Sequence, residues 1–269
     1  MSRQALSESH KLDTTRLAEK HEAQYRFVRV GDIPIRYLEQ GREHLEAGPP
    51  LLLIHGYNGS IEHWYPYTLP GLAASRRILA LDLPGCGYSG RSASYSLQNY
   101  AGTIAAFLQA LGEHKVDIMG HSMGGQVAVG LAALYPELVH KLVLVGSSGL
   151  PWEGGFWRVP LLSLGDASVR HVRLYPMFLQ VGMRARAPFQ GLTLLQKETV
   201  RDELRALRSP TLLIWGENDR VVPLSYGRQM ADLIPGAKLA VFPGCGHMPF
   251  YQKPVQFNRL VASFLSDAE

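Results

Sequence analysis

The sequence contains little cysteine and no long apolar run. Only two of its 269 residues are cysteine, Cys86 and Cys245, and they lie far apart in the chain. A chain of this length can bury a large core without covalent cross-links, so we expect both thiols to be free in a reducing compartment; a single bridge between the two predicted loops is the alternative. No window approaches the ~18 consecutive apolar residues of a membrane-spanning helix. These absences argue against a disulfide-stabilised secreted domain and a transmembrane protein, and they favour a cytoplasmic one.

The chain also has little net charge. Charged residues make up 19% of the chain, and the formal net charge is +4 at pH 7. The sequence has no dense run of lysine and arginine of the kind that follows a phosphate backbone, so nucleic acid is not an expected partner. Residues 1–24 form a polar N-terminal extension without the apolar segment of a secretory signal. Its apolar face, marked by Leu6, Leu12 and Leu17, is thin; it provides no firm membrane signal and leaves peripheral membrane association open.

From residue 25 onward, apolar runs alternate with helical patterns. Two strand-like runs flank Gly31 and Asp32 and predict a hairpin. Continuous apolar runs, as expected for strands buried on both faces of a parallel sheet, then recur as PPLLLIHG, RILALDLPG, KVDIMGHS, HKLVLVGSSG, PTLLIWGEND and AKLAVFPG. Residues 97–111 and 123–136 have the composition and spacing of helices. The pattern predicts an α/β fold with a mostly parallel central sheet flanked by helices, whose site lies at the C-terminal ends of the strands.

One segment interrupts this alternation after the sixth strand. Residues 149–207 contain no clear buried strand, are rich in leucine, arginine and aromatic residues, and are divided by prolines. We interpret them as a helical cap, or lid, inserted into a core of residues 25–148 and 208–269. Large apolar side chains of the cap are candidates for the substrate pocket: Trp152, Phe156, Trp157, Met177 and Phe178.

The most informative motif is Gly-His-Ser-Met-Gly at residues 120–124. It directly follows a strand-like run and precedes a helical one, which is the context of a nucleophile elbow. In such a turn the hydroxyl projects above the sheet, and the two glycines avoid collisions with the adjoining strand and helix. Because glycine and serine are common, a chance match is the alternative, but the strand–turn–helix context favours Ser122 as a nucleophile.

A serine hydroxyl needs a base to accept its proton. His247 follows the last strand-like run in a loop flanked by glycines, and we expect it to be this base. The acid that orients the imidazole should follow the preceding strand, where Glu217 and Asp219 both occur. The loop after LVLVG holds no acid. We choose Asp219 and keep Glu217 as the alternative.

Five segments together resemble the α/β-hydrolase superfamily, in particular its capped serine esterases and lipases: LLLIHGYNGSIEHW, LALDLPGCGYSG, DIMGHSMGGQVA, LLIWGENDRVVP and CGHMPFYQKP. They occur in the family's order and cover residues 25–269 apart from the cap. The resemblance implies the α/β-hydrolase fold, no cofactor and no metal, and the chain order serine, acid, histidine. It also implies an oxyanion hole made by the backbone N–H groups of Tyr57 and Met123, and structural roles for His55 and Asp82.

We therefore expect a carboxylesterase or lipase-like enzyme that cleaves small-molecule esters with short to medium acyl chains. Two alternatives use the same triad: perhydrolysis without a cofactor, and the hydrolysis of carbon–carbon bonds in aromatic degradation. Carbon–carbon hydrolases of the family usually have tryptophan directly after the histidine, where this chain has Met248. A non-catalytic ligand-binding protein of the same fold is a more distant alternative, against which the complete triad argues. The sequence does not indicate the oligomeric state.

Overall fold

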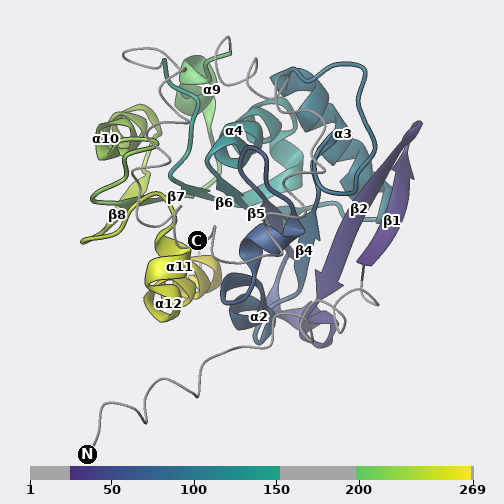
Figure 1. Cartoon of the computed structure of the whole chain (residues 1–269), viewed down its shortest axis with the longest axis horizontal. Coiled ribbons are helices and arrows are strands. Elements are labelled where there is room, and N and C mark those ends of the chain that lie inside the picture. The colour runs from purple at the N-terminus through teal and green to yellow at the C-terminus, as the bar shows by residue number, and fades with distance from the viewer. Residues whose placement is uncertain (1–24, 152–197, 268–269) are drawn as a thin grey trace, which may run out of the picture.

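The computed structural model describes residues 25–151 and 198–267, and their centre is an eight-stranded sheet (Figure 1). The strands are β1 (Tyr25–Val30), β2 (Ile33–Gln40), β3 (Leu51–Ile54), β4 (Ile78–Leu81), β5 (Val116–His121), β6 (Val139–Val145), β7 (Thr211–Gly216) and β8 (Lys238–Phe242). Their spatial order is β1-β2-β4-β3-β5-β6-β7-β8. The β1–β2 and β2–β4 pairs are antiparallel, and the remaining neighbours are parallel. The predicted hairpin and mostly parallel sheet are confirmed.

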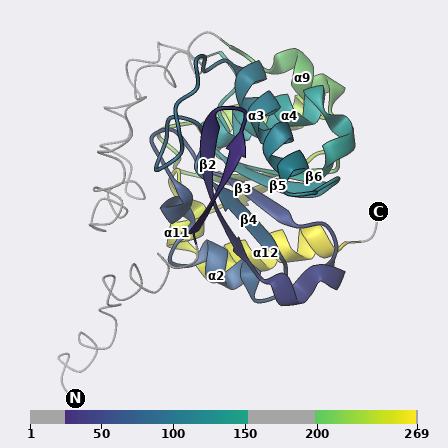
Figure 2. The ribbon, with the colours of Figure 1, turned by 90° about the vertical axis from the view of Figure 1, so that its right-hand side faces the viewer.

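Helices cover both faces of the sheet and bury a core on each (Figure 2). One layer consists of α3 (Leu97–Ala110), α4 (Met123–Leu134), α9 (Arg201–Ala206) and α10 (Leu224–Leu233). The other consists of α2 (Thr68–Ala73), α11 (Pro249–Gln252) and α12 (Pro254–Ser266). Short 3₁₀ segments connect these elements: η1 (Arg42–Ala47), η2 (Ile61–Trp64) and η3 (Pro136–Leu138).

Local sequence explains why these elements form where they do. Every residue of β3, β4 and β5 is buried, as expected for apolar runs that have a helix layer on each side. Helix α3 begins after Ser96, whose side chain accepts a hydrogen bond from the backbone N–H of Asn99 at 3.2 Å. Its buried residues Ile104, Phe107 and Leu108 recur at helical spacing and face the sheet.

The parallel register aligns the carboxyl ends of the central strands. Ile54 lies opposite Gly120, and Gly120 lies opposite Leu144. Val145 in turn lies opposite Ile214. The loops that follow β3, β5, β6 and β7 therefore start at one edge of the sheet, which is where ligand sites occur in this class of fold.

The two described ends of the inserted segment lie side by side. The backbone N–H of Val200 donates to the carbonyl of Gly149 at 2.8 Å. Helix α9, which the sequence analysis assigned to the end of the cap, packs against α4 and α10 through the buried side chain of Leu204. The chain thus leaves and re-enters the core at one place, and residues 152–197 lie outside the described residues.

The two cysteines and the described helices agree with the sequence analysis. Cys86 and Cys245 are both buried and free, which confirms the expectation that they do not pair. Within residues 25–151 and 198–267, none of the helices combines the length and apolarity needed to cross a membrane.

Candidate active site

Ser122 occupies a sharp turn between β5 and α4. Its backbone has φ of 54° and ψ of −119°, a conformation that residues with a side chain rarely adopt. The turn is held because the N–H of Ser122 donates to the carbonyl of Val145 at 2.9 Å, on the neighbouring strand β6. The carbonyl of Ser122 accepts from the N–H of Gly125 at 3.0 Å and so starts the helix. This strained strand-to-helix turn has the geometry of a nucleophile elbow.

The glycines of the motif are required by close backbone contacts. A Cβ atom on Gly120 would overlap the carbonyl of Gly124. A Cβ atom on Gly124 would overlap the carbonyls of Ile54 and His55 at the end of β3. As expected from the sequence, a side chain at either position would collide with neighbouring backbone. The two glycines therefore allow α4 to approach β3 closely enough to form the turn.

His247 and Asp219 form a buried pair on neighbouring loops. Nδ1 of His247 lies 2.8 Å from Oδ2 of Asp219, and the two residues are 4% and 6% exposed. The other carboxylate oxygen, Oδ1, accepts from the backbone N–H groups of Val221 at 2.9 Å and Val222 at 2.8 Å. Because a carboxylate only accepts, the neutral imidazole carries its proton on Nδ1 and presents Nε2 as an acceptor.

The alternative acid has a different partner. Oε2 of Glu217 accepts from the backbone N–H of Gly244 at 2.8 Å, within the loop that leads to the histidine. Glu217 therefore supports the β8–α11 loop, while Asp219 contacts the imidazole. The geometry favours the acid chosen from the sequence.

Three observations place this pair next to the Ser122 turn. A Cβ atom built on Gly146, at the end of β6, would lie 3.1 Å from Nδ1 of His247 and 3.2 Å from Oδ2 of Asp219. The ring of His121, the residue before Ser122, lies 4.5 Å from the ring of His247 between centroids. Its Nε2 also lies 3.1 Å from the carbonyl oxygen of His247. The fold thus places His247 and Asp219 beside the turn that carries Ser122, and the catalytic roles of the three residues remain predictions.

The two expected oxyanion donors belong to elements that border Ser122. Met123 is the first residue of α4, where backbone N–H groups have no partner within the helix and favour a negative charge nearby. Tyr57 follows Gly56, and a Cβ atom on Gly56 would lie 3.3 Å from Cβ of Ser122. The loop after β3 therefore runs alongside Ser122. The donor roles of Tyr57 and Met123 remain predictions.

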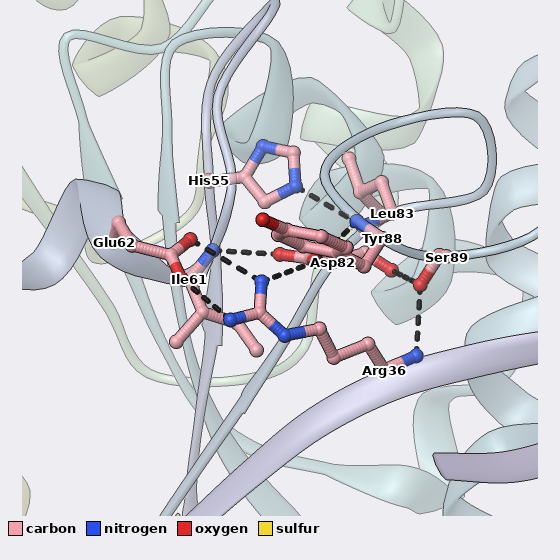
Figure 3. Close-up of polar contacts among 8 residues, drawn as sticks. All are labelled: Arg36, His55, Ile61, Glu62, Asp82, Leu83, Tyr88 and Ser89. Atoms are coloured by element: carbon pink, nitrogen blue, oxygen red, sulfur yellow. Dashed lines mark hydrogen bonds and ion pairs between the residues drawn. The ribbon is translucent and has the colours of Figure 1, made fainter. Parts of the chain in front are cut away.

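A buried charge network anchors this loop, and the sequence analysis did not identify it (Figure 3). Arg36 on β2 binds both oxygens of Glu62, at 2.6 and 3.4 Å, and Oδ2 of Asp82 at 3.0 Å. Oδ1 of Asp82 accepts from the N–H of Ile61 at 2.7 Å, which ties the loop after β3 to the end of β4. The guanidinium also lies over the ring of Tyr25, 3.6 Å from its centroid. The available sequence signal was an arginine within the apolar run IPIRYL.

The two carboxyl groups of the network respond differently to burial. Burial raises the pKa of Asp82 to about 6, although Arg36 acts in the opposite direction. Burial also opposes the ionisation of Glu62, but the charge and hydrogen bonds of Arg36 outweigh it and hold the pKa of Glu62 below its ordinary value. The single guanidinium therefore does not fully offset the cost of burying two carboxylate charges.

His55 has a structural environment, in agreement with the role implied by the resemblance. Its Nδ1 donates to the carbonyl of Gly56 at 2.8 Å, and its Nε2 accepts from the backbone N–H of Leu83 at 3.0 Å. Burial lowers the pKa of His55 to about 4, so the ring is neutral near pH 7. The ring therefore joins the loops after β3 and β4 (Figure 3).

The substrate residues expected in the cap lie outside the described residues: Trp152, Phe156, Trp157, Met177 and Phe178. The same applies to the polar extension of residues 1–24. Their predicted roles are not tested by the structure. The expectation that no cofactor or metal is needed also stays a prediction.

Comparison with known proteins agrees with this geometry. The model of the alpha/beta hydrolase family matches residues 51–260. The 2-hydroxymuconate semialdehyde hydrolase of Pseudomonas sp. (strain CF600) is 32% identical over 251 residues, which cover 83% of this chain and 89% of that protein.

Solved structures show the same likeness. The meta-cleavage product hydrolase of Pseudomonas fluorescens IP01 aligns over 91% of this chain and 99% of its own, with 26% identity and a TM-score of 0.74. An esterase of Rhodococcus sp. ECU1013 aligns over 91% of this chain and 100% of its own, with 26% identity and a TM-score of 0.75.

A serine at a strained strand-to-helix turn, beside a buried carboxylate–imidazole pair at the carboxyl edge of a mostly parallel sheet, is an arrangement typical of hydrolases with an α/β fold. The chain belongs to the alpha/beta hydrolase family. It is a hydrolase of that family, and its fold is the α/β-hydrolase fold.

Proposed function

We propose that this hydrolase cleaves carboxylic esters through an acyl-enzyme on Ser122. The observation that carries the proposal is the buried contact of 2.8 Å between His247 and Asp219, on loops that converge beside the strained Ser122 turn. A hydroxyl is a weak nucleophile on its own, and an oriented imidazole is the usual means of activating it.

In the proposed reaction, Nε2 of His247 takes the proton of the Ser122 hydroxyl as Oγ bonds to the ester carbonyl carbon. The N–H groups of Tyr57 and Met123 hold the negative oxygen of the tetrahedral intermediate. The imidazolium, stabilised by Asp219, then protonates the departing alkoxide, which leaves as the alcohol. Water, deprotonated by His247, attacks the acyl-enzyme and releases the carboxylic acid and the serine hydroxyl.

Hydrolysis of a carbon–carbon bond is the second candidate, because this chain resembles a 2-hydroxymuconate semialdehyde hydrolase and a meta-cleavage product hydrolase. The names of relatives include a semialdehyde and a dienoate, and a carboxylate on such a substrate would be bound most strongly by an arginine or lysine side chain. The sequence of the predicted cap supplies several arginines: Arg158, Arg170, Arg173, Arg184 and Arg186. Against this candidate, Met248 stands where tryptophan is usual in such enzymes.

A direct comparison of substrates tests the proposal. We would measure kcat/KM of the purified protein with p-nitrophenyl esters from acetate to palmitate and with 2-hydroxymuconate semialdehyde. The expected result is a higher kcat/KM for at least one ester. A higher value for the semialdehyde would overturn the ester assignment in favour of carbon–carbon hydrolysis.

Labelling with a fluorophosphonate separates an enzyme from a binding protein of the same fold. We expect stoichiometric labelling of the wild-type protein and none of Ser122→Ala, because the probe reacts with an activated serine. Equal labelling of the two proteins, or none of either, would contradict the assignment of Ser122 as the nucleophile.

A further inference from the structure

His121 links the two sides of the candidate site through its side chain. It is the last residue of β5 and directly precedes Ser122. Its Nε2 lies 3.1 Å from the backbone carbonyl oxygen of His247, and its Nδ1 lies 2.9 Å from Nε2 of His63 in η2. The three histidines come from a strand, a 3₁₀ segment and a loop that are far apart in the sequence, and none of the motifs used above assigned a function to His63.

The hydrogen bonds of this chain of rings have one consistent direction. A backbone carbonyl can only accept, so the N–H on Nε2 of His121 donates to His247. The Nδ1 atom of the neutral His121 ring is then an acceptor, and the N–H on Nε2 of His63 donates to it. Burial lowers the pKa of His63 to about 3, and burial together with His247 and His63 holds the pKa of His121 well below its ordinary value. Both rings are therefore neutral near pH 7.

The first ring of the chain is itself fixed from two sides. Phe250 of α11 packs against His63 and His121, with ring centroids 5.3 and 5.1 Å away. The hydroxyl of Tyr251 donates to the carbonyl oxygen of His63 at 2.8 Å. Helix α11 directly follows the loop that carries His247, so the segment that bears His247 also packs against His63.

We propose that His63 and His121 are positioning residues, which hold the backbone of His247 against the Ser122 turn and so set the distance between base and nucleophile. The inference rests on the proposed roles of Ser122 and His247. The loop around His247 contains Gly244 and Gly246, whose backbones are intrinsically permissive, so its position depends on anchors such as the hydrogen bonds that Gly244 and Gly246 donate to Glu217 and Gln252. The His121 side chain supplies one that is covalently adjacent to the nucleophile.

A pair of substitutions at His63 separates hydrogen bonding from packing. His63→Gln keeps an N–H donor at the position of Nε2 and loses the aromatic ring. His63→Phe keeps a ring against Phe250 and Trp64 and loses the donor. A role in packing alone predicts that phenylalanine is tolerated better, whereas the positioning role predicts the opposite order.

The experiment measures kcat, KM and Tm for wild type, both His63 variants and His140→Gln, with the best p-nitrophenyl ester. His140 is a matched control, because its Nδ1 binds Oδ1 of Asp117 at 2.7 Å near the opposite edge of the sheet. We expect His63→Phe to lose about 10-fold to 100-fold in kcat with KM nearly unchanged, as for a displaced catalytic group. His63→Gln should retain most of kcat, and His140→Gln should change Tm without changing kcat. A kcat of His63→Phe equal to wild type, or above that of His63→Gln, would overturn the proposal.

Two further measurements keep the outcomes distinguishable. Activity that survives Ser122→Ala in the same assay would overturn the proposed function, whereas activity lost in Ser122→Ala and kept in His63→Phe would overturn the positioning role alone. If His63→Phe does not fold, ¹⁵N NMR of the wild-type protein at pH 7 still tests the geometry. We expect the Nε2-protonated tautomer of both His63 and His121, and an Nδ1-protonated ring at either position would refute the arrangement.

Discussion

Oδ2 of Asp219 lies 2.8 Å from Nδ1 of His247, although 28 residues separate the two in the chain. The second carboxylate oxygen is held by the backbone N–H groups of Val221 and Val222. The backbone of its own loop therefore orients the carboxylate independently of the imidazole. It can fix both the tautomer and the orientation of the ring, which is what the proposed base requires.

Replacing the two candidate acids should have unequal effects. We expect Asp219→Asn to lower kcat by about 10⁴-fold, because an amide in place of the carboxylate favours the wrong imidazole tautomer. Glu217→Gln should lower kcat far less, since Glu217 contacts the N–H of Gly244. Steady-state kinetics with one ester gives the comparison, and a larger loss in Glu217→Gln would show that the acid is wrongly assigned.

Removing the nucleophile should abolish turnover and preserve the fold. We expect Ser122→Ala to lose about 10⁴-fold or more in kcat, with the residual rate supplied by binding and the oxyanion donors. Because alanine keeps the Cβ atom and removes only the hydroxyl, far-UV circular dichroism should be unchanged. Ser94→Ala, at an exposed loop position, is the matched control. Normal turnover by folded Ser122→Ala protein would refute the mechanism.

Gly146 offers a test of how tightly the acid–base pair is held. It has φ of 50°, so alanine there adopts a left-handed backbone that costs about 1–2 kcal/mol, and its Cβ atom would lie 3.1 Å from Nδ1 of His247. We expect Gly146→Ala to lower kcat by about 10-fold to 100-fold through displacement of the imidazole.

Gly236→Ala is the control for backbone strain. Gly236 has φ of 68°, and a Cβ atom there would meet nothing within 4 Å. Gly236→Ala should therefore lose thermal stability through backbone strain alone, no more than Gly146→Ala loses, and should keep wild-type kcat. Equal kcat values in the two variants would mean that crowding of the pair has no catalytic consequence.

The Arg36 network predicts a stability loss that depends on pH. Arg36→Met leaves Asp82 and Glu62 buried without their cation, and we expect the free energy of unfolding at pH 8 to fall by about 3–5 kcal/mol. Without Arg36, the folded-state pKa of both carboxyl groups rises above the unfolded value. A raised carboxyl pKa means that the folded state binds protons more tightly, so stability is greatest at low pH and is lost as the pH increases. The destabilisation should therefore be smaller at pH 5 than at pH 8.

Urea unfolding of wild type and variant at the two pH values measures this effect. Arg205→Met is the control, because Arg205 pairs with Asp202 at 2.9 Å on an exposed helix surface and its loss should change stability little. In the wild-type protein, Asp82 with its pKa of about 6 should itself make the unfolding free energy decrease between about pH 4 and pH 6, while Glu62 acts in the opposite direction. A destabilisation by Arg36→Met that does not vary with pH would contradict the charge interpretation.

The predicted cap should set the preference for acyl chain length. Each buried methylene is worth ~0.8 kcal/mol, so kcat/KM should increase roughly fourfold per methylene until the pocket is full and then fall. We expect Trp152→Ala and Phe178→Ala to alter this profile, and Leu45→Ala, at an exposed position before β3, to leave it unchanged. A flat profile that neither cap variant changes would exclude the cap from the acyl pocket.

Local sequence patterns determined most of the secondary structure and the order of the site residues. Continuous apolar runs predicted the central strands because strands covered on both faces must be apolar along their whole length. The elbow around Ser122 was predictable because the contact that requires Gly120 lies within one strand–turn–helix unit, while Gly124 is required by its close approach to the end of β3. The position of His247 after the last strand followed from chain order.

Only the tertiary structure decided which residues meet across the sheet edge. Asp219 and Glu217 are two residues apart and chemically alike, and only the packing of the β7 and β8 loops separates the one that contacts His247 from the one that binds Gly244. The Arg36 network and the contacts of His63 and His121 likewise join strands and loops distant in the chain. Periodicity indicates which face of an element is buried. The partner of a buried polar group depends on how several elements pack together, and the linear sequence does not show which residues of different elements are close in space.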